Sequence, residues 1–300
     1  MTKIFITGAN GFVGNHLINE FTKRGLSFVP GSRALYGELS TQAQWEKLLV
    51  NCSAVVHLAA RVHVMNEKSA DPLREFREVN VIGTMNLARA SKKIGVKRFI
   101  FLSSVKVNGE ENFEKAYSAD DVPAPLDYYG ISKMEAEIEL MTLHEPGVFE
   151  VVVIRPPLVY GEGVKANFEK LMLLVYRDLP LPFGLVHNVR SMVSVLNLCD
   201  LICVTLNHPK ASGEVFLVRD AQNYSLREII IQIAKTRKKT AHLLPVPVGL
   251  MKFFLILIGK KSFSDRLFGN LHLDISKNNE LLSWTPPYSF QDTFKGASRL

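Results

Sequence analysis

Two side chains four residues apart could carry proton-transfer chemistry. Tyr129 and Lys133 lie in the segment Tyr128-Tyr129-Gly130-Ile131-Ser132-Lys133, and this spacing places both on one face of a helix. A tyrosine with its ordinary pKa of about 10 is a poor base at neutral pH, but a neighbouring ammonium favours the phenolate. Tyr129 would then exchange a proton with a substrate hydroxyl. Tyr128 has Ser132 at the same spacing, which excludes it; an ordinary surface pair is the alternative interpretation.

Three glycines near the start of the chain join a predicted strand to a predicted helix. The segment from Thr7 to Gly14 reads TGANGFVG; an apolar run, Lys3 to Ile6, precedes it, and apolar residues at helical spacing follow it. Gly8 permits the tight turn, Gly11 lets backbone N–H groups approach a pyrophosphate, and Gly14 lets the helix pack closely on the strand. The segment predicts the first unit of a dinucleotide-binding fold, although a glycine-rich turn without a ligand gives the same pattern.

A pair of serines follows another apolar strand and completes the set of candidate catalytic groups. Ser103 and Ser104 come directly after the run Phe99-Ile100-Phe101-Leu102. Ser104 would hydrogen-bond the same substrate oxygen as Tyr129 and hold it in line for hydride transfer to or from a nicotinamide. Lys133 would also hold the nicotinamide ribose, and the positive nicotinamide ring would further favour the Tyr129 phenolate.

The elements that must position these groups alternate between strands and helices. Strands are predicted at 26–29, 53–60, 96–103 and 150–155, a helix at 75–93, and later pieces at 168–176, 193–195, from 198, 215–218 and 226–236. This alternation predicts an α/β protein with a Rossmann-type doubly wound parallel sheet over residues 1–155. Residues 156–300 are expected to form a smaller C-terminal α+β region that binds substrate, with some segments returning to the sheet. His57 is expected to be packed and hydrogen-bonded rather than catalytic.

The end of the second predicted strand bears on which dinucleotide is bound. An NAD enzyme normally has an acidic residue there for the adenosine ribose hydroxyls, but this chain reads Pro30-Gly31-Ser32-Arg33. A carboxylate would repel a ribose phosphate, whereas Ser32 and Arg33 would bind it. Of NAD and NADP, NADPH is therefore favoured, the alternative being that Arg33 merely faces solvent. A third strand is predicted at 35–39.

Composition excludes several classes of protein. The 300 residues include 36 basic and 29 acidic side chains, and the net charge of +7 suits diphosphate ligands or an anionic surface. No basic run is interleaved with aromatic residues, so we expect no nucleic-acid partner. Three scattered cysteines and the lack of a signal-peptide pattern before the first strand indicate a cytoplasmic protein. Cys199 and Cys203 lack a nearby Cys/His pair at ligand spacing, so no metal site is expected.

Taken in order, the glycines, the His57-Leu58-Ala59-Ala60 strand end, the serine pair and the Tyr129/Lys133 pair resemble the extended short-chain dehydrogenase/reductases, the nucleotide-sugar epimerase/dehydratase family. The match covers nearly the whole chain. The resemblance implies a UDP-sugar substrate, a homodimer and a catalytic triad of Ser104, Tyr129 and Lys133. It places the dinucleotide against Gly8, Asn10, Gly11, Phe12, Val13, Gly14, Arg33, Glu38, Leu39, Leu58, Ala59, Ala60 and Lys133, and the substrate diphosphate against Asn167, Arg190 and Arg266.

Two reactions at carbon 4 of the sugar remain once dehydration is set aside. Dehydratases of this family carry Asp-Glu after the residue equivalent to Ser104, whereas this chain has Val105 and Lys106. A 4-epimerase oxidises the hydroxyl with tightly held NAD and returns hydride to the other face. A 4-ketoreductase takes hydride once from exchangeable NADPH or NADH. A non-catalytic NADP sensor is a remote alternative, because such proteins tend to lose the Tyr or the Lys.

Three stretches, 58–65, 105–109 and 155–161, resemble a bacterial surface-polysaccharide (O-antigen) subgroup. Its members are often called UDP-glucose 4-epimerase-like, and it includes reductases of UDP-4-keto-6-deoxy-N-acetylhexosamines. Leu158 replaces an Asn that contacts the sugar, and Asn108 replaces the usual Tyr. A lost sugar-hydroxyl contact suits a 6-deoxy or keto sugar, and Arg33 suits a dissociable NADPH, so the reductase is favoured over the 4-epimerase.

The longest apolar stretch, 246–258, raises the question of membrane contact. It is shorter than the roughly 20 residues that span a bilayer, so no transmembrane helix is predicted. Its apolar residues, with Lys260 and Lys261 behind them, would suit peripheral contact of segment 246–261 with a membrane surface, where lipid-linked sugars would be met. Burial against the small domain or in an oligomer interface is the favoured interpretation.

Overall fold

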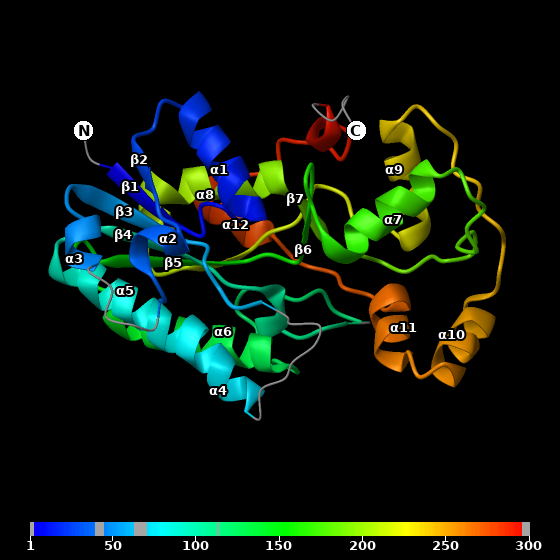
Figure 1. Ribbon diagram of the computed structural model, residues 1–300, viewed down its shortest axis with the longest axis horizontal. Coiled ribbons are helices and arrows are strands. Elements are labelled where there is room, and N and C mark those ends of the chain that lie inside the picture. Colours follow the sequence, from blue (N-terminus) through cyan, green and yellow to red (C-terminus); the bar gives the residue numbers. More distant parts are fainter. Residues whose placement is uncertain (1–2, 40–44, 63–70, 113, 296–300) are drawn as a thin grey trace.

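The computed structural model describes residues 3–39, 45–62, 71–112 and 114–295. Within these ranges parallel strands form a six-stranded sheet in the order β2-β1-β3-β4-β5-β8, and helices cover both faces (Figure 1). The strand order reverses at β1, which pairs with β2 on one side and with β3 on the other. This is the predicted Rossmann-type doubly wound α/β fold, whose ligands bind outside the carboxyl ends of the strands at the reversal.

Apolar runs form the strands of the sheet because both of its faces are covered. The strands are β1 (Lys3–Thr7), β2 (Phe28–Pro30), β3 (Cys52–His57), β4 (Arg98–Leu102), β5 (Glu150–Arg155) and β8 (Val215–Leu217). Successive side chains of a strand point to opposite faces, so Ile4 and Ile6 pack in one layer and Phe5 in the other. The strand predicted at 150–155 is confirmed with both of its ends.

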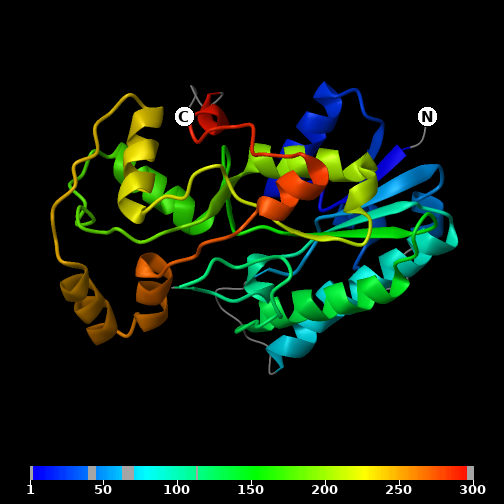
Figure 2. The ribbon, with the colours of Figure 1, turned by 180° about the vertical axis from the view of Figure 1, so that it is seen from behind.

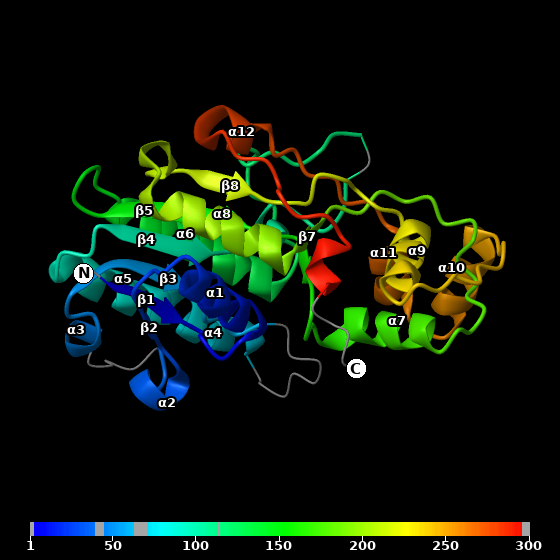
Figure 3. The ribbon, with the colours of Figure 1, turned by 90° about the horizontal axis from the view of Figure 1, so that it is seen from above.

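Two helical layers enclose the sheet (Figure 3). One layer contains α1 (Phe12–Lys23), α8 (Val195–Asn207) and α12 (Ser276–Leu282), and the other contains α3 (Trp45–Leu48), α4 (Pro72–Arg77), α5 (Gly83–Lys93) and α6 (Tyr128–Leu143). Leu17 and Phe21 of α1 pack with Leu198 of α8, while Ala136 and Leu140 of α6 pack in the opposite layer. These layers fix α1 and α6, which carry the glycine motif and the Tyr/Lys pair.

The prediction of a third strand at residues 35–39 is wrong. Residues Arg33–Tyr36 form the short helix α2, which ends at Gly37 with a φ of +74°. Tyr36 and Leu39 turn inward and pack in the same layer as Trp45. A turn therefore buries Tyr36 and Leu39 and leaves Leu35 48% exposed, because the positive φ at the glycine interrupts an extended backbone.

A π-helical turn interrupts the helix predicted at 75–93. Residues Glu78–Ile82 form this turn between α4 and α5. A wider turn rotates the apolar face of the helix that follows it. Val81 and Met85 are consequently buried, whereas Ile82, which regular helical spacing places on the apolar side, is 44% exposed.

Beyond the carboxyl ends of the strands, the C-terminal half builds a second group of elements. These are the parallel pair β6 (Leu158–Tyr160) and β7 (Met192–Ser194) and the helices α7 (Ala166–Tyr176), α9 (Leu226–Thr236), α10 (Val248–Leu257) and α11 (Lys261–Phe268). Figure 2 shows these four helices gathered at the end of the molecule opposite the N-terminus. Tyr160, Phe168 and Ile230 belong to a separate core there. The strand β8 and the helices α8 and α12 return to the main sheet; the boundary at residue 155 stays a prediction.

The expected burial of the stretch 246–258 against this small core is wrong for most of its side chains. Val248, Met251 and Leu255 pack partly against the core. The other side of α10 exposes Leu250, Phe253, Phe254, Leu257 and Ile258. No helix among the described residues is long and apolar enough to cross a membrane. An oligomer interface at this stretch stays a prediction, as does the homodimer.

Candidate active site

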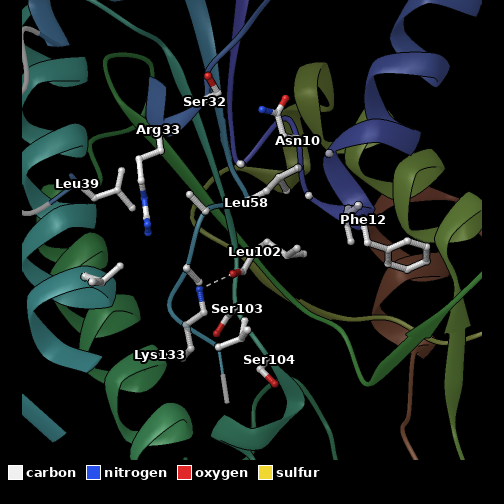
Figure 4. A pocket seen from close by; sticks show the side chains of 18 of the residues that line it. Asn10, Phe12, Ser32, Arg33, Leu39, Leu58, Leu102, Ser103, Ser104 and Lys133 are labelled. Atoms are coloured by element: carbon white, nitrogen blue, oxygen red, sulfur yellow. Dashed lines mark hydrogen bonds between the residues drawn. The ribbon is translucent and has the colours of Figure 1, made fainter. Parts of the chain in front are cut away.

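A cleft of about 640 Å³ lies at the carboxyl ends of β1, β3 and β4, where the strand order reverses. Its volume falls in the range of small-molecule and cofactor sites, and its lining is apolar with a few polar groups, as such sites require. All three expected catalytic residues line it, and so do the expected dinucleotide contacts Gly8, Asn10, Gly11, Phe12, Val13, Gly14, Arg33, Glu38, Leu39, Leu58, Ala59 and Ala60. Figure 4 shows Asn10 and Phe12 on one side of this cleft and Lys133 and Ser104 farther along it.

The glycine turn leaves no room for side chains. Gly8 has a φ of +68°, and a Cβ built there would lie 2.9 Å from the backbone nitrogen of Ala59. A Cβ at Gly14 would lie 2.2 Å from the carbonyl oxygen of Gly8, so α1 packs against the turn as the sequence predicts. Gly11 precedes α1 and gives it no side-chain cap, which leaves first-turn N–H groups for a ligand. This cradle fits a dinucleotide pyrophosphate at the positive end of the helix.

His57 is packed and hydrogen-bonded, as expected. Its Nδ1 lies 2.6 Å from Thr7 Oγ1, and its Nε2 lies 2.9 Å from Thr84 Oγ1. Complete burial lowers the pKa of His57 to about 3, and the nearby Lys133 charge acts in the same direction. Thr7 Oγ1 also accepts a 3.2 Å hydrogen bond from the Ala59 N–H, so this neutral histidine helps to hold the loop after β3 under the cleft.

The end of the cleft where the sequence predicts the adenosine ribose carries one basic and one acidic side chain. Arg33 Nε lies 3.5 Å from Glu38 Oε1, and the side chains are 76% and 54% exposed. Ser32 lies beside them in the cleft lining. The Arg33 guanidinium is therefore accessible from the cleft, and it could form a charge-assisted hydrogen bond with a ribose phosphate.

Lys133 is a fully buried ammonium under the cleft. Its Nζ donates a 2.7 Å hydrogen bond to the Leu102 carbonyl oxygen and lies 4.1 Å from the centre of the Phe101 ring. Burial lowers the pKa of Lys133 to about 7, and the negative charge of Glu137 opposes this shift. Lys133 is therefore poised to gain or lose its proton near neutral pH.

Tyr129 lines the cleft from the first turn of α6, one turn before Lys133. Burial raises the pKa of Tyr129 well above its ordinary value, and the carboxylate of Asp127 adds to this rise. The protein's own surroundings therefore oppose the phenolate that the sequence analysis expects. Ionisation of Tyr129 would therefore need a cation supplied beside it, such as the positive ring of an oxidised nicotinamide when the cofactor is bound.

The structure separates the roles of the two serines. Ser103 is buried, and its hydroxyl donates a hydrogen bond to Glu137. Ser104 is half-buried in the cleft lining, and its Oγ accepts a 3.3 Å hydrogen bond from the Lys106 N–H. The Ser104 hydroxyl hydrogen remains available to a substrate oxygen, which supports the choice of Ser104 over Ser103.

A buried polar network supports this site, and the sequence analysis missed it. Arg155 Nη2 lies 2.6 Å from Glu137 Oε2, and both side chains are buried. Arg155 Nη1 donates a 3.1 Å hydrogen bond to Asn108 Oδ1, and Asn108 Nδ2 donates one of 2.8 Å to the Ser118 carbonyl oxygen. Asn108 is therefore a structural residue, so its replacement of a tyrosine says nothing about a lost sugar contact. The available signal was Glu137 itself, a carboxylate one turn beyond Lys133 on the inward face of a helix.

Asn80, which the sequence did not single out as a site residue, positions the loop after β3 against α6. It lies in the π-helical turn and is 1% exposed. Its Oδ1 accepts from the Arg61 N–H at 2.8 Å, and its Nδ2 donates to the Arg61 carbonyl oxygen and to Ser132 Oγ. One amide thus joins the loop after β3 to the helix that carries Tyr129 and Lys133.

The three expected diphosphate contacts lie outside the described lining of this cleft. Asn167 is exposed in the first turn of α7 and Arg266 is exposed on α11. Arg190 precedes β7, and its Nη1 donates a 3.2 Å hydrogen bond to the carbonyl oxygen of Gly269, directly after α11. Arg190 and Arg266 therefore belong to adjoining segments of the small region, and their binding of a diphosphate stays a prediction. Leu158 is 47% exposed on β6, between the cleft-lining Pro157 and Val159.

In the part of the chain that the structure describes, no group of three or more His, Cys, Asp and Glu side chains is placed to hold a metal ion. Cys52, Cys199 and Cys203 are buried and unpaired. The segment 63–65 of the polysaccharide-subgroup resemblance lies outside the described residues.

Fold and site together define a dinucleotide-dependent oxidoreductase of the extended short-chain dehydrogenase/reductase type. The model of the NAD dependent epimerase/dehydratase family matches residues 4–218. The chain belongs to that family, as an NAD(P)-dependent nucleotide-sugar epimerase or reductase.

Relatives and solved structures agree with this assignment. The chain is 45% identical to a UDP-glucose 4-epimerase of Vibrio cholerae over 97% of this chain and 93% of the relative. The Thermus thermophilus UDP-glucose 4-epimerase in complex with NAD has a TM-score of 0.76 at 21% identity, over 98% of this chain and 97% of that one. The structure of RMD from Pseudomonas aeruginosa with NADPH also has a TM-score of 0.76, at 20% identity and with coverage of 98% and 97%. At these identities the two structures show the shared fold.

Proposed function

We propose that this enzyme reduces the 4-keto group of a UDP-linked 6-deoxy-N-acetylhexosamine with NADPH, in the synthesis of a bacterial surface polysaccharide such as O-antigen. The observation that carries the choice is the adenosine end of the cleft. Ser32 and Arg33 line it where an NAD enzyme normally has a carboxylate for the ribose hydroxyls. The acid there, Glu38, lies 3.5 Å from Arg33, which offsets its repulsion of a ribose phosphate.

Each catalytic residue has a task in this reduction. When bound, NADPH would supply the hydride to carbon 4. Ser104 donates a hydrogen bond to the 4-oxygen and holds the carbonyl in line, and Tyr129 delivers the proton to that oxygen. Lys133, fixed by its hydrogen bond to the Leu102 carbonyl, holds the nicotinamide ribose and stabilises the negative charge left on Tyr129.

The surroundings of Ser104 argue against a dehydratase. Val105 is buried, and Lys106 Nζ is paired with the carboxylates of Asp127 and Glu110. Elimination of water across carbons 5 and 6 needs an acid and a base, and these positions hold an apolar side chain and a paired cation. Redox chemistry at carbon 4 needs no acid or base at these two positions, because Tyr129 exchanges the proton with the 4-oxygen.

A UDP-sugar 4-epimerase is the second candidate. The 45% identical relative from Vibrio cholerae bears that name, and Ser104, Tyr129 and Lys133 suit oxidation of a 4-hydroxyl as well as reduction of a 4-ketone. An epimerase retains its cofactor through both half-reactions, whereas a reductase exchanges it after each turnover.

Two measurements on the purified protein separate the candidates. A reductase binds NADPH reversibly and oxidises it stoichiometrically with a UDP-4-keto-6-deoxy-N-acetylhexosamine. An epimerase releases NAD only on denaturation and interconverts UDP-glucose and UDP-galactose, or their N-acetylated forms, without net change in cofactor. Retained NAD together with that interconversion would overturn the reductase proposal, and NADP binding without any turnover would point to a sensor.

A further inference from the structure

Helix α10 carries two apolar stripes, and the chain covers one of them. Val248, Met251 and Leu255 recur at helical spacing and face the core of the small region. Leu250, Phe253, Phe254 and Leu257, with Ile258 directly after the helix, form the other stripe and are each 48% to 64% exposed. We call this second set the outer stripe. A soluble helix that packs on one side normally has polar residues on the other, so the outer stripe requires an occupant.

Basic residues lie close to the outer stripe along the chain. Lys252, Lys260 and Lys261 are exposed on and directly after α10, and Phe263 on α11 is a further exposed apolar side chain, with 44% exposure. Between residues 248 and 268 the sequence has four basic side chains, Lys252, Lys260, Lys261 and Arg266, against the single acid Asp265. An apolar helix face bordered by lysines is the pattern of a helix that lies in a membrane interface.

The position of α10 lets the outer stripe meet a flat surface. Helix α10 lies at the far end of the small region, away from the Rossmann sheet, and α11 lies on the side of α10 nearer the sheet (Figures 1 and 3). The two helices contact each other. The same α11 carries Arg266 and is followed by Gly269, whose carbonyl oxygen accepts from Arg190. This pair of helices therefore adjoins the predicted diphosphate contacts.

We propose that the outer stripe, together with Lys260 and Lys261 after it, binds the surface of an anionic lipid bilayer. The aromatic and aliphatic side chains enter the boundary between headgroups and acyl chains, while Lys260 and Lys261 contact anionic headgroups. The enzyme is then held peripherally, with its small region toward the bilayer and its dinucleotide cleft in water. This inference concerns a surface separate from the catalytic cleft and does not depend on which carbon-4 reaction the enzyme performs.

Charge favours a bilayer over a second copy of the chain. A symmetric contact through α10 would bring the lysines of two chains onto the same interface, where like charges repel. An anionic bilayer instead pairs each lysine with opposite charge. Each cation near such a surface contributes about a fivefold gain in partition.

The test is co-sedimentation of the full chain with vesicles, one set of phosphatidylcholine alone and one with phosphatidylglycerol added. We expect binding to the anionic vesicles, weak binding to the neutral ones, and loss of binding as salt is raised. Phe253→Ser with Phe254→Ser removes exposed apolar area, and Lys260→Glu with Lys261→Glu reverses two charges. Each pair of substitutions should lower the vesicle partition coefficient by about tenfold or more.

A matched control is the pair Val50→Ser and Val148→Ser, which removes exposed apolar side chains far from α10 and should leave partition unchanged. Dinucleotide binding by every variant, measured in parallel, shows that the fold is retained. Absence of wild-type binding to anionic vesicles would overturn the proposal. A change from dimer to monomer in the Phe253/Phe254 variant, with unaltered vesicle binding, would overturn it in favour of a second copy.

Discussion

Lys133 Nζ donates a 2.7 Å hydrogen bond to the carbonyl oxygen of Leu102, the last residue of β4. This single contact ties the helix that carries Tyr129 to the strand end that carries Ser104. The ammonium also lies against the Phe101 ring, so two buried groups, the Leu102 carbonyl and this ring, fix its position. The catalytic groups therefore come from separate elements, and the hydrogen bond between Lys133 and Leu102 fixes these elements relative to each other.

Glu137→Gln should weaken both the fold and the site. The glutamine leaves the buried Arg155 without its counter-charge, which should lower the free energy of unfolding by about 3–5 kcal/mol. Because Glu137 opposes the lowering of the Lys133 pKa, its removal should shift that pKa below about 7. Lys133 acts while protonated, so the alkaline limb of the rate profile should move to lower pH.

Urea denaturation and the pH dependence of turnover check the two parts. Glu139→Gln, on the half-exposed side of the same helix, is the control and should change neither quantity appreciably. An unaltered pH profile in a folded Glu137→Gln enzyme would show that Glu137 does not tune Lys133.

Substitution of the two serines should have distinct effects. Ser104→Ala removes the hydrogen bond to the reacting oxygen and should lower kcat roughly 100-fold. Ser103→Ala removes a hydrogen bond to buried Glu137 and should cost about 1–3 kcal/mol of unfolding free energy. Steady-state kinetics and denaturation on both variants check this, and a larger kcat loss for Ser103→Ala would reverse the assignment.

Arg33→Ala should change the cofactor preference. Loss of a charge-assisted contact to the ribose phosphate should raise the Kd of NADPH roughly 10- to 100-fold, while the Kd of NADH, which lacks that phosphate, changes little. Titration of nucleotide fluorescence measures both constants. Arg89→Ala removes an exposed arginine of α5 outside the cleft and is the control. Equal effects of Arg33→Ala on both nucleotides would remove the basis for preferring NADPH.

His57 should make the protein sensitive to acid. Its pKa is about 3 in the folded chain against an ordinary value of 6.5, so below pH 6.5 the unfolded state binds a proton that the folded state does not. The contribution of His57 to stability is therefore present above pH 6.5 and is lost as the pH falls toward 3, amounting to about 2 kcal/mol at pH 5.

Urea denaturation of His57→Gln at pH 7 and pH 5 tests this dependence. The variant should be less stable at pH 7 yet lack about 2 kcal/mol of the decline between the two pH values. His187→Gln, at an exposed position, should keep the wild-type decline. The same decline in His57→Gln and wild type would contradict the assignment.

The sequence predicts those parts of the site that depend on local spacing. Gly8 and Gly11 lie in one turn with Gly14 in the helix that follows it, and Tyr129 and Lys133 lie on one helical face, so a short segment specifies each group. The strand β5 and the helix α9 are predicted with both ends, because apolar runs with clear boundaries define them.

Features that depend on distant partners could not be predicted. The pairing of Glu137 with Arg155 joins a helix to a strand, and neither residue reveals the other in the sequence. The π-helical turn at Glu78–Ile82 changes the helical phase without a sequence signal that we identified. The apolar residues of α10 repeat on two faces, and periodicity does not tell which face the small core covers.

The most direct test of the central claim is the rate of hydride transfer to the sugar in Tyr129→Phe, compared with Tyr128→Phe. The side chain of Tyr128 is 50% exposed beside Tyr129, so the second variant controls for loss of a hydroxyl in the same turn. We predict that Tyr129→Phe binds NADPH normally but transfers hydride at least about 100-fold more slowly, and that Tyr128→Phe retains the wild-type rate. A wild-type rate in Tyr129→Phe would contradict the account.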